Sequence, residues 1–197
     1  MNVIAKVKYF LLLLLPFQSA MAQFVLPDFQ TNATAKDSVR KKQILEYTAP
    51  YDFSIAVSVH SFWSRDTTYY KVLTRKAGQW SAAFLKISGE RDNPPQQIIA
   101  IETEPVEQKY CDHIFALLEL SRLFTLNNDS LNNDSSYQKH PVMDAAYYTF
   151  LVRTKGKLRV INAYAPHSYY DNHPDLPGTT ERKYFIDCLD FFYKLFR

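Results

Sequence analysis

Hydrophobic and polar residues alternate through the middle of the chain. In 53–60 every second residue is large and apolar, and the residues between them are small or polar. This period of two is typical of a strand with one buried face. Two further runs, 69–75 and 80–88, flank the polar stretch 76–79, which predicts a hairpin. Residues 98–101 indicate a short fourth strand.

The spacing of apolar residues changes after the fourth strand. Within 106–126 they recur at steps of three and four residues, which predicts a helix with a wide apolar face. A second helix is expected to begin at Thr179 or Thr180, either of which can cap it, and its apolar stripe runs to Phe196. The chain is therefore expected to combine antiparallel strands with two amphipathic helices.

A second hairpin over 147–164 resembles the first one. Residues 147–158 share five of twelve positions with 69–80, and the turn glycine is among them. The segments that open the two helices, 107–110 and 181–184, also begin alike. An internal duplication explains this pattern. The alternative is that any two hairpins with aromatic strands and a glycine turn look similar.

These patterns predict an α+β fold, with an antiparallel sheet of five or six strands and two helices packed on one face. We expect one domain over 51–197, built from duplicated hairpin-plus-helix units over about 52–126 and 145–197. The polar segment 23–50 is expected to be a partly ordered lead-in. The sequence 127–136, NNDSLNNDSS, is expected to be a solvated loop.

The first residues have the character of an export signal. Two lysines precede the apolar run 9–17, and an Ala-x-Ala-like site ends at Ala22. The pattern predicts a signal peptide over 1–22, cleaved between Ala22 and Gln23. The apolar run is too short to span a bilayer, and no cysteine follows the site to carry a lipid. We therefore expect a periplasmic or secreted protein.

Charge excludes two classes of partner. The chain has 23 basic and 20 acidic residues, and two of the basic ones lie in the predicted signal peptide. The mature chain is therefore almost neutral, with interspersed signs. This balance gives no basis for binding nucleic acid or an anionic membrane.

The mature chain contains two cysteines, Cys111 and Cys188, and both lie on apolar positions of the predicted helices. An exported protein can form a disulfide between them. The alternative is a pair of buried thiols that pack as small hydrophobic groups. The spacing excludes a Cys-x-x-C redox motif.

The strongest cluster of candidate ligands lies in 166–178, which is expected to be a long loop because it contains three prolines. Two imidazoles and two carboxylates within nine residues are ligand types that zinc accepts. Their spacing matches no zinc motif, so the alternatives are a solvated loop or an aromatic recognition surface, and no cofactor is predicted. The candidate ligands are His167, Asp171, His173 and Asp175.

Three Asp-Ser/Thr triplets resemble the acceptor sites of periplasmic O-glycosylation in some Gram-negative bacteria. Their acceptor residues are Ser38, Thr67 and Ser130. Such triplets also occur by chance. Because this modification takes place in the periplasm, the three sites are candidates only if the protein is exported.

Catalytic patterns do not assemble in this sequence. There is no Gly-x-Ser-x-Gly motif, and Cys111 and His113 lie on different faces of their predicted helix. We therefore expect a non-enzymatic protein that binds another protein or an envelope component. The alternatives are a small-ligand-binding protein that uses the open sheet face or the 166–178 loop, and a hydrolase without a recognisable motif. A closed pocket of several hundred Å³ would favour the small ligand, whereas a broad, flat aromatic patch would favour a protein partner.

Overall fold

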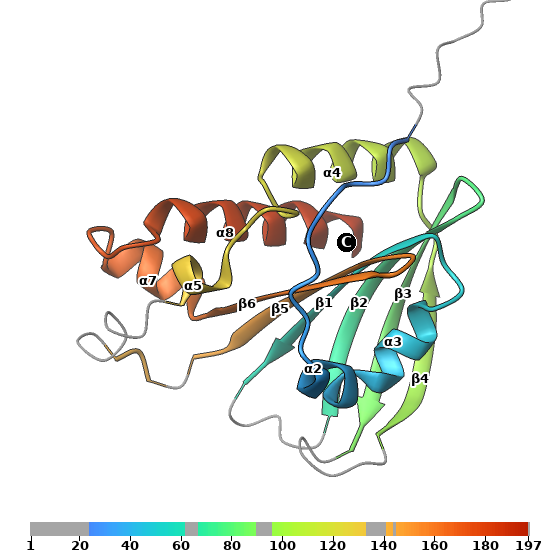
Figure 1. The fold of residues 1–197 in the computed structure, drawn as a ribbon, viewed down its shortest axis with the longest axis horizontal. Helices are drawn as coiled ribbons and strands as arrows, with labels where there is room; N and C mark the ends of the chain where they lie inside the picture. Colours follow the sequence, from blue (N-terminus) through green and yellow to red (C-terminus); the bar gives the residue numbers. More distant parts are fainter. Residues whose placement is uncertain (1–23, 62–66, 90–95, 133–140, 144, 197) are drawn as a thin grey trace, which may run out of the picture.

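The fold is that of a computed structural model, which describes residues 24–61, 67–89, 96–132, 141–143 and 145–196. Its centre is one antiparallel six-stranded sheet with the order β4-β3-β2-β1-β5-β6 (Figure 1). The strands are β1 (Phe53–His60), β2 (Thr67–Lys76), β3 (Gln79–Ser88), β4 (Gln97–Glu104), β5 (Tyr147–Thr154) and β6 (Lys157–Tyr164).

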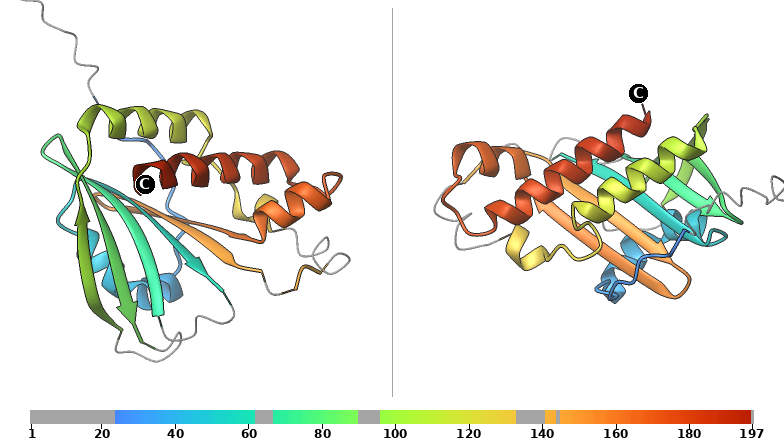
Figure 2. Two further views of the ribbon diagram at one scale, coloured as in Figure 1. Left: turned by 180° about the vertical axis from the view of Figure 1, so that it is seen from behind. Right: turned by 90° about the horizontal axis from the view of Figure 1, so that it is seen from above.

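Helices lie on both sides of this sheet. α4 (Gln108–Leu120) and α8 (Thr179–Tyr193) lie side by side on one face, which we call the helix face (Figure 2). The shorter α2 (Ala35–Arg40) and α3 (Lys42–Thr48) lie on the opposite face (Figure 1). The α+β class and the packing of two helices on one face are therefore confirmed. The remaining helices are α5 (Asn128–Leu131), α7 (Pro166–Asn172) and the 3₁₀ turn η2 (Lys194–Phe196).

The main core fills the space between the helix face and the two long helices. Phe53 and Ile55 of β1 are fully buried, as the alternation predicted. Phe150 of β5 meets Phe185 and Phe192 of α8, with ring centroids 5.3 and 5.9 Å apart. Each such side chain contributes about 2 kcal/mol when it is withdrawn from water. Period-two strands and period-3.6 helices thus bury matching apolar faces.

Over 24–50 the chain forms two short helices and contacts both faces of the sheet. Phe24 and Phe29 pack into the core of the helix face, whereas Ile44 of α3 is buried on the opposite face. Between them the chain passes β6, where Asn32 bonds to the backbone of Val160. A few apolar side chains in this polar segment are thus enough to anchor it to both cores.

Three asparagine side chains cover the outer edge of β6, and we call this set the asparagine clasp. It consists of Asn32, Asn128 and Asn132. Asn128 donates to the carbonyl of Val160 at 2.9 Å and accepts from the amide of Asn162 at 2.9 Å. Each carboxamide thereby replaces the peptide group of a missing neighbour strand, which protects a sheet edge.

Two of these asparagines lie in the repeat NNDSLNNDSS, which was expected to be a loop. Its described part instead forms α5, and Leu131 is fully buried. Asn127 caps this short helix by accepting a hydrogen bond from the amide of Asp129 at 2.9 Å. The prediction of a solvated loop is wrong over these residues, because the buried leucine and the clasp hold the polar segment against β6. Residues 133–136 lie outside the described part.

The segment 166–178 is also not a simple loop. Pro166 begins α7, and Tyr169 in this helix is completely buried. Proline suits the first turn of a helix because its missing N–H has no intrahelical partner there. At the end of the segment, Gly178 rather than a threonine caps α8, and the Thr179 hydroxyl donates to the carbonyl of Leu176. The expected loop and the expected cap are both corrected.

The two similar hairpins flank β1, and β1 pairs with both of them. Arg75 and Arg153 occupy the same position in the two hairpins, yet Arg75 opposes Phe53 and Arg153 opposes Ser54. Because neighbouring residues of a strand point to opposite faces, these arginines lie on opposite faces of the sheet. α4 and α8, by contrast, cover the same face. The likeness is therefore local to the hairpins, and an ancestral duplication stays a prediction.

Candidate functional site

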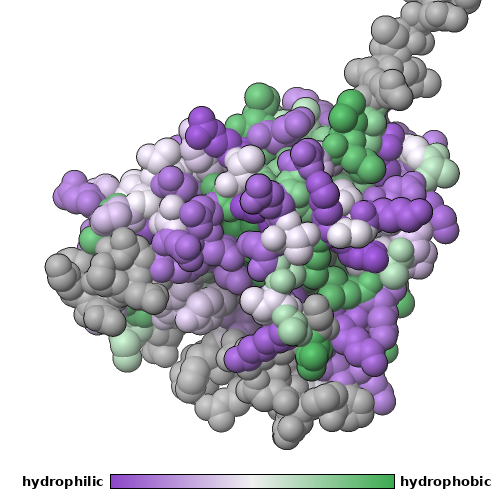
Figure 3. All heavy atoms as spheres, in the orientation of Figure 1, coloured by the Kyte–Doolittle hydropathy of each residue, from purple (hydrophilic) through white to green (hydrophobic). Residues whose placement is uncertain are grey.

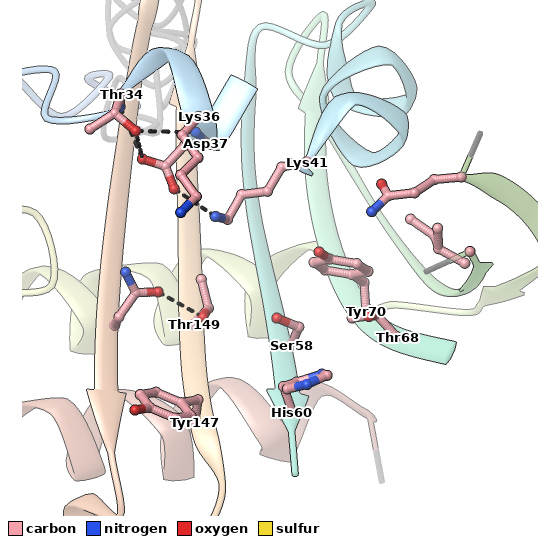
Figure 4. A pocket seen from close by; sticks show the side chains of 14 residues that line it. Thr34, Lys36, Asp37, Lys41, Ser58, His60, Thr68, Tyr70, Tyr147 and Thr149 are labelled. Atoms are coloured by element: carbon pink, nitrogen blue, oxygen red, sulfur yellow. Dashed lines mark hydrogen bonds and ion pairs between the residues drawn. The ribbon is translucent and has the colours of Figure 1, made fainter. Parts of the chain in front are cut away.

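A cavity of about 390 Å³ lies on the opposite face, between α2 and the sheet (Figure 4). α2 forms one wall, and β1, β2, β5 and β6 supply most of the floor. The lining residues are Thr34, Lys36, Asp37, Lys41, Ser58, His60, Thr68, Tyr70, Ile87, Gly89, Gln96, Tyr147, Thr149 and Asn162.

Strand register aligns four polar side chains across the floor, and we call them the floor row. Ser58 of β1 opposes Tyr70 on one side and Thr149 on the other, and Thr149 opposes Asn162 of β6. The Thr149 hydroxyl donates to the side-chain oxygen of Asn162 at 2.8 Å. Residues from four strands thus form one line of hydroxyl and amide groups.

Tyr70 is the aromatic member of the floor row, and 7% of its surface is exposed. Burial raises its pKa to about 12, although a hydrogen bond with Ser58 opposes this shift. The phenol therefore stays neutral at physiological pH and acts as a hydrogen-bonding group.

A second register row marks the mouth of the cavity. His60 at the end of β1 opposes Tyr147, and Tyr147 opposes Tyr164. The rings of the two tyrosines lie 4.6 Å apart, and about half of Tyr147 is exposed. An exposed tyrosine beside a polar floor offers an apolar ring face to an entering ligand.

The wall formed by α2 is held in place by a capping box. Asp37 accepts hydrogen bonds from the backbone amide of Thr34 at 2.9 Å and from its hydroxyl at 2.7 Å. Lys41 donates to the other carboxylate oxygen at 2.7 Å. Burial alone raises the pKa of Asp37, but the hydrogen bonds from Lys41 and Thr34 lower it to about 2. The carboxylate is therefore ionised at every physiological pH.

The charged groups of the cavity gather at this wall. Figure 4 shows Lys36 on α2 and Lys41 just after this helix, with the side chain of Lys41 extending to Asp37. Asp37 is the only acidic residue among the described residues that line the cavity, and it is paired with Lys41. Lys36 forms no ion pair within the described part of the chain. The site thus combines neutral hydrogen-bonding groups with a surplus of one positive charge.

The candidate metal ligands lie elsewhere in the molecule. His167 and Asp171 are in α7, His173 follows its last residue, and Asp175 is in the turn before α8. His167 lies against the ring of Tyr148, with centroids 6.3 Å apart, and His173 lies 6.0 Å from the ring of Tyr169. Over the described residues, no group of three or more His, Cys, Asp or Glu side chains could hold a metal ion.

The two cysteines are buried free thiols in the structure. Cys111 lies on α4 and Cys188 on α8, both in the core of the helix face. The Cys188 thiol donates to the carbonyl of Ser121 at 3.5 Å. Burial raises the pKa of both thiols, which keeps them protonated and poorly reactive at neutral pH.

The remaining predicted sites fall in different places. Ser38 lies in α2, Thr67 begins β2 and Ser130 lies in α5. Thr67 and Ser130 are not among the described residues that line the cavity. The predicted cleavage site between Ala22 and Gln23 lies outside the described residues.

Sequence reasoning did not find the cavity. The alternation in β1 correctly placed Ser58 and His60 away from the main core, and this was the available signal. It did not show that Thr149 and Asn162, about a hundred residues later, complete the same row. The wall was missed because the segment containing α2 was expected to be a lead-in.

Comparisons of the chain with protein-family models, with curated proteins and with solved structures find no match. Among the helices in the described ranges, none has both the length and the apolar character needed to cross a membrane. The face in Figure 3 carries hydrophobic residues in small groups separated by hydrophilic ones. The cavity is therefore the feature whose chemistry bears most directly on function.

Proposed function

We propose that this protein is an exported, non-enzymatic binding protein that holds a small, hydroxyl-rich ligand in the cavity on the opposite face of its sheet. Export is supported by the predicted signal peptide over 1–22. The ligand is supported above all by the floor row, in which four hydrogen-bonding side chains from four strands face one space.

The dimensions of the cavity suit a small molecule. Its volume of about 390 Å³ lies within the usual range for ligand sites, which runs from roughly 300 to 1,000 Å³. The sequence-based expectation for a small ligand was a closed pocket of several hundred Å³, and this cavity matches it in volume but is partly open to solvent. Binding of an envelope protein stays a prediction from the sequence.

The floor chemistry selects the kind of ligand. Serine, threonine and tyrosine hydroxyls donate and accept hydrogen bonds, and the Asn162 carboxamide does both as well. Such a surface satisfies a molecule that itself carries several hydroxyl groups, as a sugar does. Tyr147 at the mouth adds a ring face on which the apolar side of a sugar ring can lie.

The same hydrogen bonds favour binding over hydrolysis. A nucleophilic serine needs a base in contact with its hydroxyl. The Ser58 hydroxyl instead bonds to Tyr70, whose raised pKa leaves it neutral. The floor row is thus built to form hydrogen bonds with a ligand.

Titration with monosaccharides and disaccharides, neutral and acidic, followed by NMR of the backbone amides, tests this function. We expect binding in the millimolar range or tighter, about −4 kcal/mol or better, with shifts centred on Ser58, Tyr70 and Asn162. Shifts confined to other surfaces, or none with any sugar, would refute the proposal.

A pair of variants on one strand sharpens this test. Thr68→Trp places a large ring in the cavity, and we expect at least about tenfold weaker binding. Tyr69→Trp is the matched control because Tyr69 is the next residue, points to the opposite side of the sheet and is 58% exposed. Equal affinities of the two variants would contradict the assignment of the site.

A further inference from the structure

We infer that the ligand carries a carboxylate or a phosphate, which lies against Lys36 and Lys41, while its hydroxyl groups face the floor row. This inference rests on the proposed function and adds the charge and the orientation of the ligand. The class it names is an acidic sugar or a sugar phosphate.

Positive charge predominates around the cavity. Two ammonium groups and one carboxylate line the α2 wall, and the carboxylate is already bound to Lys41 at 2.7 Å. The rest of the described lining is made of neutral groups and His60. A positive charge beside a partly enclosed space attracts anions and repels cations. The cavity therefore selects against a cationic ligand.

The α2 wall is preorganised. The capping box fixes the first turn of α2, and Asp37 holds Lys41 four residues along the helix. The side chain of Lys41 is 16% exposed and that of Asp37 is 22% exposed. Because this pair is shielded from water, its position costs little further ordering when a ligand binds. Because the charge of Lys41 is balanced by Asp37, the ammonium of Lys36 is the charge that the ligand neutralises.

The charged and the hydroxyl groups lie on different elements. Lys36 belongs to α2 and Lys41 follows its last residue, while the floor row is on the sheet (Figure 4). A ligand that is charged at one end and hydroxylated elsewhere satisfies both sides at once. The anionic end pairs with the ammonium of Lys36, which is exposed. The hydroxyl groups add hydrogen bonds to a floor row whose members already bond to one another.

Calorimetric titration with four probes tests the inference: glucose, glucosamine, glucuronate and glucose 6-phosphate. We expect the two anionic probes to bind at least about tenfold more tightly than glucose, and glucosamine to bind most weakly. The preference is expected to shrink at high salt because the charges are partly exposed. Comparison of glucuronate with glucose 6-phosphate identifies the acidic group.

Variants at Lys36 assign this preference to the α2 wall. Lys36→Gln is expected to weaken the anionic probes about tenfold and leave glucose unchanged, whereas Lys36→Arg retains the preference. Lys42→Gln is the matched control. It removes the same charge from the next helix, where Lys42 is exposed, pairs with Glu46 at 3.7 Å and does not line the cavity.

The outcomes separate the inference from the function on which it rests. Equal affinity for glucose and glucuronate, unaffected by Lys36→Gln but abolished by Thr68→Trp, overturns the inference and leaves the binding function standing. Anion binding that Lys42→Gln weakens as much as Lys36→Gln also overturns it, because the effect is then one of net charge. The absence of binding by all four probes removes both.

Discussion

Gly178 is the position at which the structure predicts the largest effect of one added methyl group. Its φ of +82° is in the left-handed region, and it caps α8. An ideal Cβ at this position would lie 1.8 Å from the carbonyl oxygen of Ser130 in α5 and 3.3 Å from the nearest guanidinium nitrogen of Arg182. Gly178→Ala must therefore displace backbone, and no rotation of a side chain can relieve the contact.

The magnitude has two parts. The left-handed backbone costs a residue with a Cβ about 1–2 kcal/mol. Moving α5 away from Gly178 also strains the asparagine clasp, because Asn128 and Asn132 are anchored by this helix. Losing two of its hydrogen bonds costs about 2 kcal/mol more. We therefore expect Gly178→Ala to lower the free energy of unfolding by about 3–4 kcal/mol.

Gly156 supplies a matched control. It has the same φ of +82° in the turn between β5 and β6, and no atom lies within 4 Å of the corresponding Cβ. Gly156→Ala should therefore cost only the backbone part, about 1–2 kcal/mol. The difference between the two variants isolates the contact between Gly178 and α5.

Urea denaturation of both variants and the parent protein measures this difference. Hydrogen exchange at the amides of Asn162 and Tyr164 reports on the clasp separately, and faster exchange is expected only in Gly178→Ala. Equal destabilisation by the two substitutions would refute the reasoning, since the backbone conformation alone would then account for both.

Two further predictions concern buried polar and thiol groups. Asn128→Asp removes the donor to the Val160 carbonyl and places a carboxylate beside it, so urea denaturation should show that the free energy of unfolding falls by about 2 kcal/mol. Asn172→Asp is the control, because this amide bonds to Ser168 within α7, and the expected loss is under about 0.5 kcal/mol. Equal losses in the two variants would contradict the role given to the asparagine clasp. Burial raises the pKa of Cys111 to about 11 and also raises that of Cys188, so both thiols of the native protein should resist iodoacetamide at pH 8. After denaturation, mass spectrometry should detect two iodoacetamide adducts per chain. Rapid labelling of the native protein, or fewer than two adducts after denaturation without reductant, would show that the thiols are not buried and free.

Regular elements with one apolar face were predictable from the sequence. The alternation around Phe53 and Ile55 identified β1, and the stripe through Phe185 and Phe192 identified α8. The physical reason is that the repeat of a strand or helix imposes its period on any sequence that buries one side of it. The α+β class and the helix face follow from this alone.

Polar segments were misjudged for the converse reason. Asn32 and Asn128 carry no periodic signal, and their role depends on the backbone of Val160 in β6, which lies more than thirty residues away in the chain from either of them. Pro166 and the polar residues after it were expected to form a loop, yet Tyr169 is buried and anchors α7. A single buried side chain or a pair of amide hydrogen bonds is enough to order such a segment. Its anchoring role can be recognised only once the tertiary structure shows the group that it contacts.

The candidate site divides in the same way. The sequence by itself determined that Ser58 and His60 face away from the main core, because the period of β1 requires it. Only the tertiary structure decided that Tyr70, Thr149 and Asn162 join Ser58 in one row, since strand pairing, not proximity in the chain, sets that register. The tertiary structure also placed α2 above this row, and the cavity is the space between α2 and the sheet.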